Sequence, residues 1–138
     1  MRFVDTNVLL YAVSRAAEER PKAAIARQLL RRRDLALSVQ VLQELYVQAT
    51  RESRPDRLRH DQAVRLVESL CRYPVQELTL PIVQAAFATR ARWRLSYWDA
   101  AILEAARAGG CEVVLSEDLA DGEDYDGVRV ENPFREAG

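Results

Sequence analysis

The chain alternates short apolar runs with longer segments in which apolar residues recur every three or four positions. The short runs predict buried strands at residues 2–5, 35–37, 75–78, 113–115 and 128–130. The longer segments predict helices at residues 7–14, 20–33, 38–51, 55–70, 81–93 and 96–108. Strands that alternate with helices in this way predict an α/β fold of three layers, α/β/α, with a short and mostly parallel central sheet.

No feature of the sequence divides the chain into parts. It contains no internal repeat and no Gly/Ser-rich linker, and 138 residues suit one domain, so we expect a single domain over residues 1–138. Its apolar runs are too short to span a membrane. The two cysteines, Cys71 and Cys111, have no metal-like spacing, and we expect both to be buried thiols of a cytoplasmic protein.

The charge is close to balanced overall, at −1, but unevenly distributed. Arginines gather in residues 31–33, 51–59 and 90–94, whereas acids gather in residues 117–126. A uniformly basic protein would indicate general nucleic-acid binding, and this chain is not one. The arginine clusters could hold phosphates beside an acidic centre, or they could be solvated helix faces.

Two carboxylates follow predicted strands directly. Asp5 ends the first strand, and Asp118 comes shortly after the strand at 113–115, in a loop that also holds Glu117 and Asp121. Because sites in parallel sheets lie beyond the carboxyl ends of the strands, we expect these acids at one edge of the sheet. Each could instead be an ordinary helix or turn cap, and the sequence leaves open which acid of the loop points inward.

Two further carboxylates lie on predicted helices next to apolar positions. Glu44 borders the apolar stripe of the helix that Ser38 should cap, although its residue type and position alone favour an ordinary exposed glutamate. Asp99 follows Ser96 in the spacing of a capping box, yet it shares a helix face with Leu95 and Ile102. A carboxylate so close to the core is costly unless donors or a cation meet it.

Several acids gathered at one sheet edge would repel one another unless a cation neutralised them. An acid-rich site without histidine suits Mg²⁺ or Mn²⁺ rather than zinc, and His60, the only histidine, lies in a charged stretch that predicts a surface position. The chain has no glycine-rich phosphate loop and no serine nucleophile motif. The chemistry that remains is hydrolysis by a metal-activated water.

Four segments in this order resemble the motifs of the PIN-domain ribonucleases: residues 3–9, Ser38 with Glu44-Leu45, residues 96–102 and residues 114–119. The resemblance runs on to residues 132–134 and implies a PIN-like fold. It also implies an acidic centre that consists of Asp5, Glu44, Asp99 and Asp118. These four residues would bind Mg²⁺ or Mn²⁺ and would be the catalytic residues. Thr6, Asn7 and Ser116 match the small polar residues that would orient these ligands. Because the last motif has more acids than the pattern requires, Asp121 is the expected extra contributor.

Single-domain members of this size are typically VapC-like toxins. The resemblance therefore implies an endoribonuclease toxin with RNA as substrate, a cognate antitoxin as partner, and a homodimer. Two other functions stay open: a catalytically silent module that binds RNA or antitoxin, and a metal phosphohydrolase for small phosphoesters. The apolar helix positions, among them Leu42, Leu45, Tyr46, Ala49 and Trp93, are expected to be mostly core, with some left for a partner groove.

Overall fold

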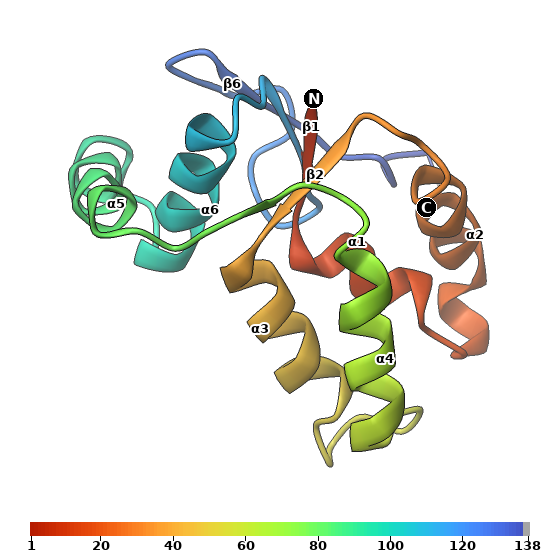
Figure 1. Cartoon of the computed structure of the whole chain (residues 1–138). Helices are drawn as coiled ribbons and strands as arrows, with labels where there is room; N and C mark the ends of the chain where they lie inside the picture. Colours follow the sequence, from red (N-terminus) through yellow and green to blue (C-terminus); the bar gives the residue numbers. More distant parts are fainter. Residues whose placement is uncertain (137–138) are drawn as a thin grey trace.

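The computed structural model describes residues 1–136, and its centre is a six-stranded sheet (Figure 1). The strands are β1 (Arg2–Val4), β2 (Leu35–Ser38), β3 (Val75–Gln76), β4 (Val113–Leu115), β5 (Asp124–Tyr125) and β6 (Val128–Glu131). Their order is β3-β2-β1-β4-β6-β5, and every pair is parallel except β5 with β6. The central strands are apolar because both faces of the sheet are covered.

Helices surround the sheet in two layers. They are α1 (Thr6–Ala12), α2 (Arg20–Leu29), α3 (Val39–Ala49), α4 (His60–Leu70), α5 (Leu80–Trp93) and α6 (Tyr97–Ala108), with a short 3-10 turn η1 (Ala17–Glu19) before α2. In Figure 1, α6 with α5 outside it lies on one side of the sheet, α1 and α2 lie on the other, and α3 and α4 extend beyond β2. The predicted α/β fold with a mostly parallel sheet is confirmed.

The fourth helix begins at His60, later than the predicted start at residue 55. The carboxylate of Asp56 accepts a hydrogen bond from the backbone N–H of Arg15 at 2.7 Å and pairs with Arg54 at 3.1 Å. These contacts hold the segment as a loop against the end of α1. The helix starts where the side chain of Gln62 accepts from the backbone N–H of Arg59 at 2.9 Å, which satisfies an otherwise unpaired group of the first turn.

Other differences are local. Helix α2 ends at Leu29 instead of continuing to residue 33, and strand β5 was not predicted. Strand β5 exists because Asp126 and Gly127 take positive φ angles of 54° and 96°, which form a tight hairpin turn with β6. Cys111 is buried as expected, but Cys71 is exposed, because it is the C-terminal cap of α4. Within residues 1–136 no helix has the length and apolar character needed to span a membrane.

The carboxyl ends of the neighbouring strands β2, β1 and β4 meet at one edge of the sheet. The backbone N–H of Asp5 donates to the carbonyl of Leu115 at 3.0 Å, which ties the segment after β1 to the end of β4. Ser38, the last residue of β2, accepts from the backbone N–H of Val41 and so begins α3. The three connections that leave this edge carry Asp5, Glu44 and Asp118 of the candidate site, and helix α6 carries Asp99.

Candidate metal centre at the carboxyl edge of the sheet

Asp5 lies at the middle of this edge and is only 6% exposed. One carboxylate oxygen accepts from the backbone N–H of Thr6 at 2.7 Å, so Asp5 caps α1 as the ordinary interpretation of the sequence required. The other oxygen accepts from the Ser116 hydroxyl at 2.8 Å and from the Asn7 amide at 3.3 Å. Asp5 is thus both a cap and a buried carboxylate that faces the end of β4.

Asn7 joins the first acid to the last. Its side-chain amide donates to Asp118 at 3.2 Å and to the Ser116 hydroxyl at 3.3 Å, in addition to Asp5. Its carbonyl accepts from the backbone N–H of Glu117 at 3.1 Å. Ser116 in turn accepts from the backbone N–H of Asp118 at 3.1 Å. The predicted polar residues therefore hold the loop after β4 against the start of α1.

Glu44 reaches the same region from α3. Its carboxylate accepts from the Thr6 hydroxyl at 3.4 Å and from the side-chain amide of Gln40 at 3.2 Å. Gln40, one helical turn before Glu44, also donates to the carbonyl of Trp98 at 3.4 Å. Gln40 was not predicted to belong to the site; its place one helical turn before Glu44 was the only signal that the sequence offered.

Asp99 lies in the first turn of α6 and is half-buried. Its backbone N–H donates to the Ser96 hydroxyl at 3.1 Å, which confirms Ser96 as the cap. The negative charges of Asp99 and Asp118 both raise the pKa of Glu44, and that of Asp118 raises the pKa of Asp99. The four acids predicted from separate segments therefore act on one another electrostatically.

Burial and mutual repulsion disfavour the ionised forms of these acids. Burial is the largest cause that raises the pKa of Asp5, from 3.8 to about 6, and the charges of Glu44 and Asp118 add to it. Burial also raises the pKa values of Glu44 and Asp99. Within the part of the chain that the structure describes, none of the four forms an ion pair with Arg, Lys or His. The edge thus concentrates negative charge without a protein cation.

The structure separates the acids of the loop after β4. The Glu117 carboxylate turns away and pairs with Lys22, while Asp118 accepts from Asn7. Asp121 accepts from the backbone N–H of Asn132 at 2.9 Å and pairs with Arg135 at 3.1 Å. Asp121, the expected extra contributor, is therefore engaged elsewhere, and Asp118 is the acid of this loop that joins the cluster.

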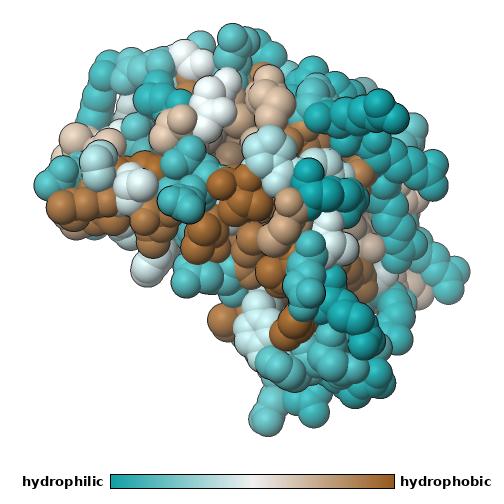
Figure 2. All heavy atoms as spheres, in the orientation of Figure 1, coloured by the Kyte–Doolittle hydropathy of each residue, from teal (hydrophilic) through white to brown (hydrophobic). Residues whose placement is uncertain are grey.

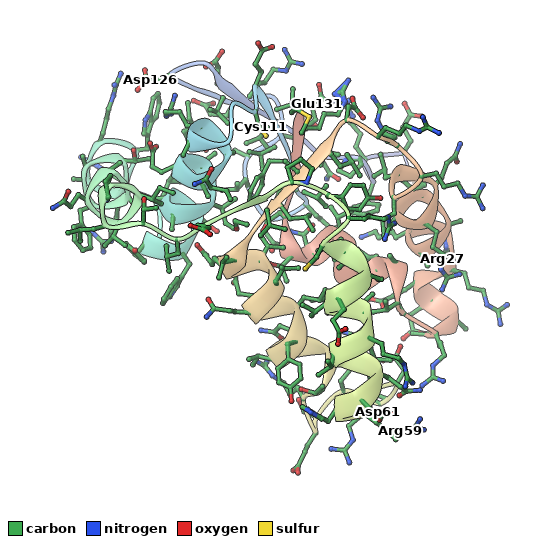
Figure 3. All side chains as sticks on the ribbon, in the orientation of Figure 1. Arg27, Arg59, Asp61, Cys111, Asp126 and Glu131 are labelled. Atoms are coloured by element: carbon green, nitrogen blue, oxygen red, sulfur yellow. The ribbon has the colours of Figure 1, made fainter. Side chains whose placement is uncertain are left out.

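The arginine clusters do not surround these acids. Arg32 pairs with Asp34 in front of β2, and Arg2 of β1 approaches the same carboxylate, so residues 31–33 lie at the opposite, amino edge of the sheet. Arg59 pairs with Asp61 at the far end of α4, as the labels in Figure 3 show. In the third cluster, Arg92 pairs with Asp126 of the hairpin turn. Much of the arginine charge is used in ion pairs away from the site.

The donor set suits a hard divalent cation. Four carboxylates and neighbouring hydroxyl and amide oxygens are the ligands that Mg²⁺ and Mn²⁺ prefer, and the raised pKa values mark charge that a cation would neutralise. As the side chains stand, no three His, Cys, Asp or Glu residues among residues 1–136 are arranged to hold an ion. The carboxylate oxygens of three of the acids accept hydrogen bonds instead: Asp5 from Ser116, Glu44 from Thr6 and Gln40, and Asp118 from Asn7. The four acids fit a divalent cation in the kind of ligand that they offer.

The chain resembles known proteins in sequence and in fold. A family model described as PIN domain matches residues 2–120. No curated protein sequence matches the chain. Among solved structures, a toxin–antitoxin complex from Klebsiella pneumoniae is similar with a TM-score of 0.68 and 23% identity, covering 96% of this chain and 98% of that one.

Two other solved structures are similar over most of their length. VapC20 from Mycobacterium tuberculosis, a sarcin–ricin-loop-cleaving toxin, has a TM-score of 0.66 and 18% identity, covering 86% of this chain and 92% of its own. FitAcB from Neisseria gonorrhoeae has a TM-score of 0.63 and 18% identity, with coverages of 98% and 99%. At these identities the likeness shows the fold, and the family model shows the membership. The chain belongs to the PIN domain family.

Proposed function

We propose that the protein is a metal-dependent endoribonuclease and the toxin of a toxin–antitoxin pair. The observation that carries the proposal is the group of acids with raised pKa values and no protein cation at the carboxyl edge of a PIN domain. Similar structures support the choice of substrate and partner, since one is a toxin that cleaves the sarcin–ricin loop and another is a toxin–antitoxin complex. The reaction is hydrolysis of an RNA phosphodiester, in which water attacks phosphorus and a P–O bond breaks.

Asp5, Glu44, Asp99 and Asp118 would hold Mg²⁺ or Mn²⁺, and the ions when bound would activate water and stabilise charge on the phosphate. The chain's own residues prepare the site. Ser116 and the backbone of Thr6 fix the two oxygens of Asp5, and the Thr6 hydroxyl orients Glu44. Asn7 holds Asp118 toward the others. Such neighbours preset the direction of each ligand before an ion arrives.

A cognate antitoxin and a second copy of the chain are the proposed protein partners. Figure 2 shows a hydrophobic band that runs from α5 toward α3. Large apolar side chains that are exposed on these elements and their neighbours include Val47 of α3, Leu80 and Phe87 of α5, Leu78 just before α5 and Trp98 of α6. Beside it, a hollow of about 480 Å³ between α3 and α4 is lined mainly by apolar residues that include Leu42 and Tyr46. An apolar surface of this kind is typical of a protein interface. Of the apolar positions of α3, Leu45 and Ala49 are buried in the core and are not available to a partner.

The direct test is cleavage of total cellular RNA by the purified protein with Mn²⁺ or Mg²⁺, beside a chelator control and Asp99→Asn. We expect cutting that requires both the metal and Asp99. RNA binding without cleavage by folded, metal-loaded protein would favour the silent binding module. Hydrolysis of a chromogenic phosphoester that RNA fails to inhibit would favour the small-molecule enzyme.

A further inference from the structure

Glu117 is the acid next to Asp118 that the metal centre does not use, and side chains from two helices hold it. Lys22 of α2 lies 2.5 Å from one carboxylate oxygen, and the Tyr11 hydroxyl of α1 donates to the other at 2.6 Å. Lys22 also donates to the Tyr11 hydroxyl at 3.4 Å, which closes the triangle. We call these three residues the Glu117 clamp.

The clamp is built into the fold. Lys22, the only lysine in the chain, lies over the ring of Tyr11 at 5.1 Å and over that of Phe134 at 6.0 Å, and these two rings pack edge to face at 4.9 Å. The side chains of Lys22 and Glu117 are only 27% and 25% exposed. An ion pair that is mostly enclosed in this way is more ordered than the exposed pairs on the arginine-rich surfaces.

The clamp acts on the backbone that carries Asp118. The N–H of Glu117 donates to the Asn7 side chain at 3.1 Å, and the N–H groups of Asp118 and Leu119 donate to the Ser116 hydroxyl at 3.1 and 3.3 Å. Glu117 lies between Ser116 and Asp118 in this loop, so the hold of Lys22 and Tyr11 on its side chain adds a further attachment to those made by Asn7 and Ser116. Without that attachment, Glu117 would be an additional unpaired carboxylate beside the four acids.

We infer that Lys22 and Tyr11 are positioning residues: by holding Glu117 they fix the 116–119 loop so that Asp118 is preset to bind the divalent cation. The inference rests on the proposed function for its consequence in metal binding. The hydrogen bonds that fix the loop are present in the metal-free protein, so its structural part can be measured without any metal.

The test compares Lys22→Met, Lys22→Arg and the double variant Lys22→Met/Glu117→Gln. The matched control is Arg32→Met, which removes a cation of equal charge from a pair at the opposite edge of the sheet. For Lys22→Met we expect about tenfold weaker Mn²⁺ binding by calorimetry and about tenfold lower kcat, with KM for RNA unchanged. In metal-free protein, amide hydrogen exchange at residues 117–119 should be about tenfold faster.

Lys22→Arg should retain most of the Mn²⁺ affinity. Arg32→Met should match the wild type in Mn²⁺ affinity, in kcat and in amide exchange at residues 117–119. The double variant separates positioning from simple charge neutralisation, because it leaves no unpaired charge but removes the contact that Lys22 makes in the clamp. We expect the double variant to bind Mn²⁺ more weakly than the wild type, and recovery of wild-type affinity would overturn the inference. Unchanged amide exchange at residues 117–119 in Lys22→Met would also overturn it. If the wild type itself bound no Mn²⁺, the proposed function would fail, and the exchange rates would still decide whether the clamp holds the loop.

Discussion

Asp5→Asn is expected to reduce RNA cleavage roughly a thousandfold and, at the same time, to make the metal-free protein more stable at pH 7. The loss of activity would reflect the removal of a proposed metal ligand, worth about 4 kcal/mol of transition-state stabilisation. The gain in stability arises because burial raises the pKa of Asp5 from 3.8 to about 6, so the ionised form is penalised in the folded protein.

The sign of the stability effect follows from the pKa of Asp5 in each state. The folded protein holds the proton more tightly than the unfolded chain, so the benefit from a protonated Asp5 is complete below pH 3.8 and is lost as the pH rises through about 6. At pH 7 the penalty is about 3 kcal/mol at most, from roughly 1.4 kcal/mol per pKa unit. An asparagine amide would meet the donating groups of Asn7 and Ser116, which costs part of this benefit, so we expect a net gain of about 1 to 2 kcal/mol.

Urea unfolding in the presence of chelator, at pH 4 and pH 7, measures this gain. Asp121→Asn is the matched control, since it removes an acid of the same loop region that pairs with Arg135 instead of joining the cluster. The gain for Asp5→Asn should be small at pH 4 and largest at pH 7. Equal stability of wild type and Asp5→Asn at both pH values would contradict the assignment of Asp5 as a strained, buried carboxylate.

The second large effect is stabilisation by the cation itself. Mn²⁺ at a hundred times its dissociation constant should raise the free energy of unfolding by about 2.7 kcal/mol. Protons compete for the same oxygens, and because the pKa of Asp5 is about 6, Mn²⁺ affinity should fall by about tenfold per pH unit below that value. Cleavage should follow the same pH dependence.

Thermal unfolding with and without Mn²⁺, at pH 5 and pH 7.5, tests this linkage. The shift in Tm should be larger at pH 7.5 and should disappear on addition of chelator. A shift of equal size at both pH values, or an equal shift in Asp5→Asn, would show that the ion binds somewhere other than this edge.

The rule that sites follow the carboxyl ends of parallel strands was sufficient to predict the position of Asp5 and of the loop after β4. Glu44 and Asp99 were harder, because a helical acid beside an apolar stripe is also common on surfaces. They were selected by their apolar neighbours and by the resemblance to PIN-domain motifs. In the structure, burial raises the pKa values of both, and the charge of Asp118 raises them further; the charge of Asp99 also raises the pKa of Glu44.

The choice among the acids after β4 could not be made from the sequence. Glu117, Asp118 and Asp121 are close in the chain and equally charged, and their directions depend on distant partners: Lys22 for Glu117, Asn7 for Asp118 and Arg135 for Asp121. Helix α4 was predicted to start too early for a similar reason. The loop before it is held by Asp56 against Arg15, a contact between residues far apart in sequence.

The central claim is that the acids at the carboxyl edge of the sheet form a divalent-metal centre that depends on Asp5. The measurement that tests it most directly is calorimetric titration of Mn²⁺ into wild type, Asp5→Asn and Asp121→Asn at pH 7.5. We expect the wild type to bind Mn²⁺, Asp5→Asn to lose that binding, and Asp121→Asn to retain it. Wild-type affinity in Asp5→Asn, or no binding by the folded wild type, would contradict it.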